Sequence, residues 1–143
     1  QVPSGHDPSQ YVTRRLMAPA HDGEMIPVTL LYRKDAKLDG SEPVWLYGYG
    51  SYGISLPAGF NTNILSLVNR GFIYATAHIR GGQEKGRRWY KTGKLELKTN
   101  SFRDFIENDL ALATAHLVEI QKILDAYNET PAPVASSETA NKP

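Results

Sequence analysis

The run VWLYGYGSYG at residues 44–53 has the residue types and spacing most able to do chemistry. Gly48, Gly50 and Gly53 spell G-x-G-x-x-G directly after an apolar stretch. In a dinucleotide-binding turn such glycines let the backbone approach a pyrophosphate, which sits at the N-terminus of the helix that follows. The alternative is a purely structural role, in which the three glycines only let the chain turn sharply after a strand.

The helix expected after these glycines begins too late for the nucleotide interpretation. Pro57, Gly59 and the polar residues 61–63 follow Gly53, so we expect that helix to start only near Asn61. Its N-terminus then lies several residues beyond the turn. Arg80, at the end of the next predicted strand, would suit a 2′-phosphate. An NADP-binding βαβ domain therefore stays as the less favoured alternative.

The elements that position this run form a simple series. Residues 11–16 and 26–33 alternate apolar with polar side chains, and the turn-forming His21-Asp22-Gly23 between them predicts a hairpin. Residues 44–47 predict a short buried strand and residues 61–69 a helix that stops at Gly71. Residues 72–79 are apolar and β-rich without clean alternation, which predicts a strand buried on both faces.

Strand, helix and strand in succession make a βαβ unit and hence a parallel pair. The predicted fold class is therefore α/β, with a leading antiparallel hairpin. After a polar segment, the apolar spacing at residues 102–124 predicts a helix whose broad apolar stripe must be buried, either in this chain or against a partner. We predict a linker at residues 1–10 and a disordered tail at residues 131–143.

Composition excludes several classes of function. The 143 residues carry a net charge of +1, which argues against nucleic-acid binding. There is no cysteine for disulfides or thiolate metal sites, and no apolar run approaches the ~20 residues of a membrane span. The four histidines lack metal-ligand spacing, and no metal or cofactor is expected. Without a signal peptide, a cytoplasmic location is expected, although the chain lacks an initiator Met.

Two long motifs resemble the prolyl oligopeptidase family of serine peptidases (S9A), and within it the oligopeptidase B branch (protease II). They are LYGYGSYG at residues 46–53 and GFIYATAHIRGGQEKGRRWYKTGKLELKTNSFRDF at residues 71–105. The stretch YVTRRLMAPAHDGEMIPVTLLYRKD at residues 11–35 is similar to the entry into that family's catalytic domain. The resemblance covers residues 11 to about 106.

This resemblance implies the first part of an α/β-hydrolase catalytic domain, normally accompanied by a seven-bladed β-propeller. It implies hydrolysis of short peptides by a Ser-Asp-His triad, with cleavage after Arg or Lys. Tyr49 matches the family's oxyanion-hole tyrosine. A phenol on a glycine-permitted turn after a buried strand can be aimed where negative charge develops.

The nucleophile of such an enzyme is absent from the sequence. No serine has glycine both two residues before it and two residues after it, as G-x-S-x-G requires. Ser51, for example, has Gly53 after it but Tyr49 before it. The resemblance ends near Ile106, and residues 107–130 form a divergent helix. We therefore expect a fragment of a serine oligopeptidase that is inactive alone. The alternative is a nonenzymatic interaction module built on the C-terminal helix.

Two further expectations concern the segment around Arg80. An ion pair such as Arg80–Glu84 would hold the RGGxE loop, in preference to a catalytic role for either residue. His78, at a strand end, is expected to be a packed neutral imidazole.

Overall fold

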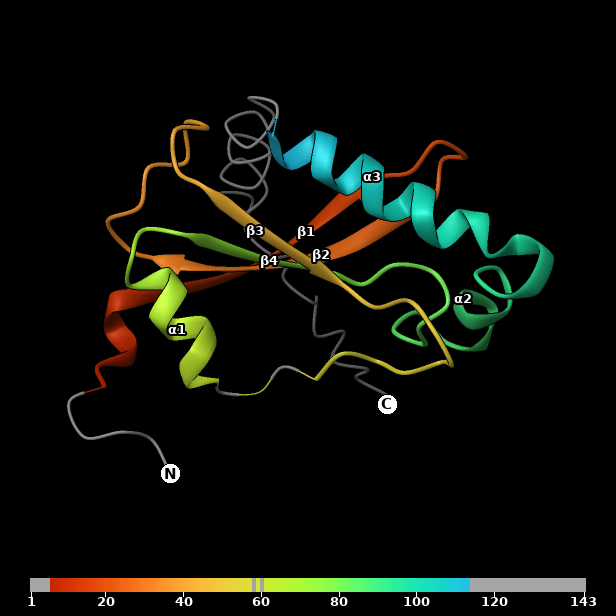
Figure 1. Ribbon diagram of the computed structural model, residues 1–143, viewed down its shortest axis with the longest axis horizontal. Coiled ribbons are helices and arrows are strands. Elements are labelled where there is room, and N and C mark those ends of the chain that lie inside the picture. Colours follow the sequence, from red (N-terminus) through yellow and green to blue (C-terminus); the bar gives the residue numbers. More distant parts are fainter. Residues whose placement is uncertain (1–5, 58, 60, 114–143) are drawn as a thin grey trace, which may run out of the picture.

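The computed structural model describes residues 6–57, 59 and 61–113. The first five residues of the predicted linker, the part of the predicted helix beyond residue 113 and the predicted tail lie outside the described residues. Within them, a short 3-10 helix (Pro8–Gln10) capped by Asp7 leads into the first strand. The chain forms one mixed sheet with a helix on each side (Figure 1).

The sheet has the strand order β1-β2-β4-β3. Strands β1 (Tyr11–Pro19) and β2 (Met25–Arg33) pair antiparallel over nine residue pairs, as the hairpin prediction required. Strand β3 (Val44–Gly48) runs parallel to β4 (Ile73–Ala77), and β4 runs antiparallel to β2. The predicted α/β class, hairpin and βαβ unit are confirmed.

The two faces of the sheet differ in chemistry. One face carries the apolar core, formed by buried Leu16, Ala18, Val28, Leu30, Tyr32, Ile73 and Ala75. On the other face Tyr74 and Thr76 are only half-buried, so the predicted burial of this strand on both faces is wrong. Threonine in an apolar-looking run marks the half-polar face, which the sequence prediction passed over.

Helix α1 (Thr62–Val68) begins where the sequence predicts. The side chain of Asn61 caps it, accepting from the amides of Asn63 at 2.9 Å and Ile64 at 3.4 Å. Gly71 follows with φ +93°, a conformation that favours glycine. Helix α1 packs on β2 and β4, and α3 (Thr99–Ala113) packs on β1, β2 and β3 from the other side (Figure 1).

The described part of α3 buries a polar face, and Phe102 and Ile106 of the predicted apolar stripe are not covered by the described residues of this chain. Ser101, Asp104 and Asn108 are each at most 1% exposed, whereas Phe102 is 62% and Ile106 57% exposed. The reason is that this helix faces an arginine and several backbone carbonyls, which need hydrogen-bonding partners when buried. Phe105 is half-buried and packs against Gly48.

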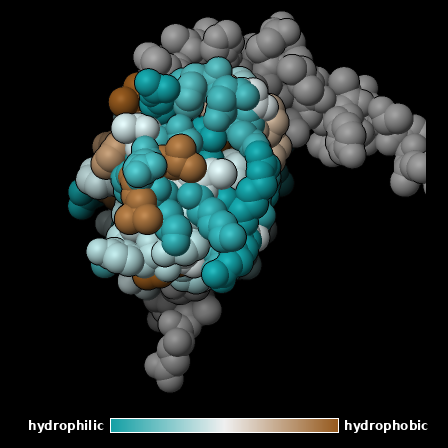
Figure 2. Space-filling view, turned by 90° about the vertical axis from the view of Figure 1, so that its right-hand side faces the viewer, coloured by the Kyte–Doolittle hydropathy of each residue, from teal (hydrophilic) through white to brown (hydrophobic). Residues whose placement is uncertain are grey.

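The polar segment between Gly82 and α3 contains two short helical elements. They are α2 (Arg87–Lys91) and a 3-10 helix (Leu95–Leu97). Trp89 of α2 is 1% exposed and donates its ring N–H to the His78 carbonyl at 3.0 Å. The end of the molecule that carries α2 and the start of α3 is mainly hydrophilic, with scattered hydrophobic residues (Figure 2).

Candidate active site

Tyr49 lies directly after the C-terminal end of β3, at the edge of the sheet. Its side chain is 41% exposed. The chain then turns sharply, with positive φ at Gly50 (59°), Tyr52 (55°) and Gly53 (67°). The turn therefore needs its glycines for conformation, and it presents the tyrosine at the surface.

The turn is fixed against the loop that follows β4. The Gly53 amide donates to the Gly81 carbonyl at 2.9 Å. A Cβ on Gly50 would lie 2.5 Å from Ile79 Cγ1 and 2.8 Å from the Arg80 carbonyl, and a Cβ on Gly81 would clash with the Gly50 carbonyl. Two glycine backbones thus meet where any side chain would force them apart.

Lys98 reaches this turn from the junction between the 3-10 helix and α3. Its Nζ donates to the Gly50 carbonyl, to Ser51 Oγ at 2.9 Å and to Ser101 Oγ at 3.3 Å. Burial lowers the pKa of the Lys98 ammonium. No carboxylate within the described part of the chain forms an ion pair with it.

Arg80 is the centre of a buried ionic network, but its partners differ from the predicted one. Its guanidinium binds Asp104 of α3 through Nε at 2.9 Å and Nη2 at 2.5 Å, and Asp22 of the hairpin turn through Nη1 at 2.5 Å. The predicted Arg80–Glu84 pair is wrong. Asp104 lies five positions after Thr99, the first residue of α3, and the sequence alone did not distinguish it from acidic residues that face solvent.

Glu84 instead contacts His78. Its Oε1 lies 3.4 Å from His78 Nδ1 and accepts from the Leu56 amide at 3.0 Å, while His78 Nε2 lies 2.8 Å from Thr29 Oγ1. Burial works against ionisation of Glu84, yet these hydrogen bonds outweigh it and hold its pKa below the usual 4.5. His78 is 7% exposed, so the expectation of a packed imidazole is confirmed.

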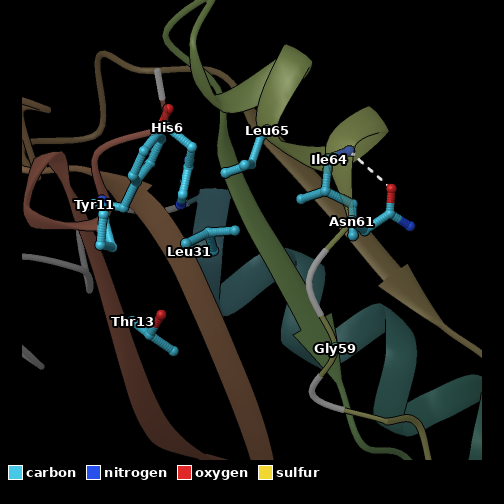
Figure 3. A pocket seen from close by; sticks show the side chains of 9 residues that line it. His6, Tyr11, Thr13, Leu31, Gly59, Asn61, Ile64 and Leu65 are labelled. Atoms are coloured by element: carbon cyan, nitrogen blue, oxygen red, sulfur yellow. Dashed lines mark hydrogen bonds between the residues drawn. The ribbon is translucent and has the colours of Figure 1, made fainter. Parts of the chain in front are cut away.

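Two hollows lie on the α1 side of the sheet. One of about 260 Å³ lies between α1 and the start of the hairpin, where Ile64 and Leu65 face Leu31 and Tyr11 (Figure 3). A wider one of about 500 Å³ extends toward Thr29, Thr76, His78 and Glu84. Tyr49 lines neither of these two hollows.

The nucleotide interpretation meets two obstacles in this geometry. Helix α1 starts at Thr62, far beyond Gly53, and Arg80 is 2% exposed and bound to two carboxylates. Among the described residues no cluster of three His, Asp or Glu side chains could hold a metal ion. None of the described helices is both long and apolar enough to cross a membrane.

Sequence reasoning missed the residues that secure the turn. Lys98, Ser101 and Asp104 recur every three positions and share the inward side of the start of α3. Ser101 Oγ donates to the Arg80 carbonyl at 2.5 Å and to the Gly93 carbonyl at 3.2 Å. The polar spacing was the available signal, but the neighbouring Thr99, Asn100 and Arg103 are polar too, so the sequence did not single these three residues out.

Comparison with known proteins places these features in a family. The model of the prolyl oligopeptidase family matches residues 58–124. The chain is 57% identical to dipeptidyl aminopeptidase BI of Pseudoxanthomonas mexicana over 104 residues, which cover 72% of this chain and 14% of that protein. It is 39% identical to protease 2 of Moraxella lacunata over 118 residues, covering 82% of this chain and 16% of that protein.

The fold is similar as well. Oligopeptidase B of Trypanosoma brucei, solved with covalently bound antipain, superposes with a TM-score of 0.75 and 44% identity over 80% of this chain and 16% of that one. The chain thus spans about one sixth of the length of the relatives it matches.

Proposed function

Because this chain belongs to the prolyl oligopeptidase family of serine peptidases, we propose that it supplies the oxyanion-stabilising part of a peptidase catalytic domain. Tyr49 is the group that acts on the reaction. Its hydroxyl donates to the oxygen of the tetrahedral intermediate as negative charge develops there. The serine, aspartate and histidine of the triad come from outside residues 1–143, which contain no G-x-S-x-G.

The observation that carries this proposal is the way the turn is held. Tyr49 leaves the end of a strand and is followed by a glycine with no room for a side chain. An oxyanion donor is effective when it is fixed before the reaction begins, because no reorganisation is then needed. A loop that served only to reverse the chain would not need backbones in such close contact.

The substrate proposed is a short peptide. The names of the relatives describe a dipeptidyl aminopeptidase, a protease and an oligopeptidase. Cleavage after Arg or Lys remains the expectation from the oligopeptidase B resemblance. The 57% identity to a dipeptidyl aminopeptidase adds release of dipeptides as the competing pattern.

A chimaera tests the proposal. The 104-residue segment of the Pseudoxanthomonas enzyme that matches this chain is replaced by the residues of this chain. The proposal expects a folded chimaera with peptidase turnover within about tenfold of the parent, because the two segments are 57% identical and cores tolerate hydrophobic substitutions that keep their volume. A folded chimaera without measurable turnover would contradict it.

A second candidate function is a nonenzymatic interaction module, favoured by one observation. Phe102 and Ile106 lie four residues apart on α3 and are both exposed, so they form an apolar strip on one face of the helix. Light scattering after size exclusion separates the two: a defined oligomer that Phe102→Ser disperses supports the module. A monomer that this substitution leaves unchanged opposes it.

A further inference from the structure

We infer that Lys98 is a positioning residue: it clamps the turn that presents Tyr49, and so sets where the phenol points. This inference rests on the proposed oxyanion role of Tyr49, and it extends that role to a residue on a different element. The clamp joins the edge of the sheet to the start of α3.

The first support is the match between donors and acceptors. An ammonium group has three N–H donors and no acceptor. Lys98 Nζ has three oxygen partners: the Gly50 carbonyl, Ser51 Oγ at 2.9 Å and Ser101 Oγ at 3.3 Å. Two of the three belong to the residues directly after Tyr49. The charge is therefore directed at the turn rather than at solvent.

The second support is the close packing of Gly81 against the Gly50 carbonyl. The Gly50 carbonyl lies so close to Gly81 that a Cβ there would clash with it. Gly81 is itself held, since its amide donates to the Trp89 carbonyl at 3.0 Å. The peptide group after Tyr49 is thus confined between a glycine backbone and the Lys98 ammonium. Removing the ammonium would leave this peptide group confined on one side only, by Gly81.

The third support is strained backbone at both ends of the clamp. Tyr52 has φ 55° and Leu95 has φ 51°, and neither is a glycine. Such conformations persist when the surroundings hold them, and they gather at functional sites. Tyr52 is one residue from Ser51, and Leu95 accepts from the Lys98 amide at 3.0 Å. The clamp thus joins two segments that each hold a non-glycine residue at positive φ.

The surroundings of the Lys98 ammonium are neutral among the described residues. No acidic side chain there pairs with it, so its partners are the three oxygens and the face of the Phe102 ring, whose centroid is 5.7 Å from Nζ. Burial lowers the pKa of this lysine, which agrees with a partly desolvated cation. Arginine retains charge and donors but has a planar fork, so it restores the contact only in part.

The first experiment uses the full chain without substitutions. NMR with ¹⁵N labelling observes the Lys98 ammonium and the Gly53 amide. We expect a Lys98 ammonium signal that persists at near-neutral pH, because its protons are held in hydrogen bonds. An ammonium that exchanges with water as fast as that of Lys91, which is exposed on α2, would overturn the inference.

The second experiment compares Lys98→Met, Lys98→Arg and the control Lys91→Met in the same chain. Loss of a charged hydrogen-bonding group should speed exchange of the Gly53 amide on the order of tenfold and shift the Tyr49 ring signals. Lys98→Arg should show a smaller change and Lys91→Met none. Exchange within about twofold of the unaltered chain in Lys98→Met would overturn the inference. If that variant does not fold, Ser51→Ala, which removes one acceptor, is measured in its place.

The chimaera separates this inference from the proposed function. There Lys98→Met should lower kcat and leave KM within about twofold, since a misplaced oxyanion donor affects only the transition state. If Tyr49→Phe leaves the chimaera fully active, the proposed function fails, and the exchange data on the unaltered chain still decide the role of Lys98. If Tyr49→Phe is damaging while Lys98→Met changes neither kcat nor exchange, the inference alone fails.

Discussion

At the scale of single residues, Arg80 connects three parts of the chain that are distant in sequence. Its guanidinium binds Asp22 of the hairpin turn and Asp104 of α3, and its carbonyl accepts from Ser101. Neighbouring carboxylates raise the pKa of the guanidinium, with Asp104 contributing most. A fully satisfied buried network of this kind fixes how the loop after β4 is placed.

Removing one partner of this network should be costly. We predict that Asp104→Ala lowers the free energy of unfolding by about 3–5 kcal/mol, because it leaves a buried guanidinium without its main counter-charge. The matched control is Arg88→Met, which breaks the exposed ion pair with Glu24. That change should cost at most about 1 kcal/mol. Urea unfolding followed by circular dichroism measures both, and equal losses would contradict the account.

Acid should destabilise the chain in a predictable direction. The Arg80 hydrogen bond lowers the pKa of Asp22, and the pKa of Glu84 is also lowered. Because these folded-state pKa values lie below the usual 3.8 and 4.5, the unfolded chain binds protons first as the pH falls. The stabilisation is therefore fully present above about pH 5 and is lost progressively below pH 4.

Unfolding free energies between pH 7 and pH 3 test this prediction. Glu84→Gln should flatten part of the decline, since the glutamine binds no proton. Glu96→Gln, at an exposed position of the 3-10 helix, should leave the decline unchanged. A stability that rises toward pH 3 in the unaltered chain would refute the assignment.

At the scale of elements, the turn after β3 depends on contact between backbones. Gly50 has φ 59° and Ile79 occupies the place of its missing Cβ. We predict that Gly50→Ala lowers the free energy of unfolding by about 2–4 kcal/mol, the sum of left-handed strain and overpacking. Gly23→Ala is the control: φ is 81° but nothing lies within 4 Å, so only the strain of about 1–2 kcal/mol applies. Thermal unfolding that ranks them in the reverse order would show that the close contact is not real.

The elements differ in how readily the sequence predicts them. The hairpin, β3, α1 and β4 were predictable because local periodicity and turn residues such as Gly23 and Asn61 encode them. The orientation of α3 was not, because its apolar residues dominate the pattern while its partner is Arg80 and a set of carbonyls. The face of a helix that becomes buried depends on the groups that it packs against. For α3 these groups include residues 80 and 93, which only the tertiary structure brings next to it.

The candidate site shows the same division. Tyr49 was recognisable from its motif, since a glycine-framed tyrosine after a strand is a local feature. Lys98 was not, because the oxygens that it binds belong to residues about 50 positions earlier. The predicted Arg80–Glu84 pair failed for a related reason: short spacing favoured it, but Glu84 points to His78 and Leu56.

At the scale of the whole molecule, the described residues leave one edge of the sheet open. Among them β3 pairs only with β4, so its other edge carries no strand, and Trp45 and Tyr47 beside that edge are 49% and 42% exposed. Open edges and exposed aromatic residues favour association. The relatives extend far beyond the part that this chain matches.

We predict that the isolated chain hydrolyses neither Arg or Lys esters nor dipeptide amides. Without a nucleophile, a bound oxyanion donor has no intermediate to stabilise. Pure chain incubated with fluorogenic substrates of both types tests this, with the unaltered Pseudoxanthomonas enzyme as positive control. Turnover that scales with chain concentration and is lost in Tyr49→Phe belongs to the chain itself and would contradict the prediction.

The central claim is that Tyr49 stabilises the oxyanion, and the chimaera tests it most directly. Tyr49→Phe and the matched control Tyr52→Phe each remove one phenol hydroxyl from the same turn, and Tyr52 is 83% exposed. We predict that Tyr49→Phe lowers kcat by about 10²–10³ with little change in KM, while Tyr52→Phe retains full turnover. Equal kcat values for the two folded variants would contradict the account.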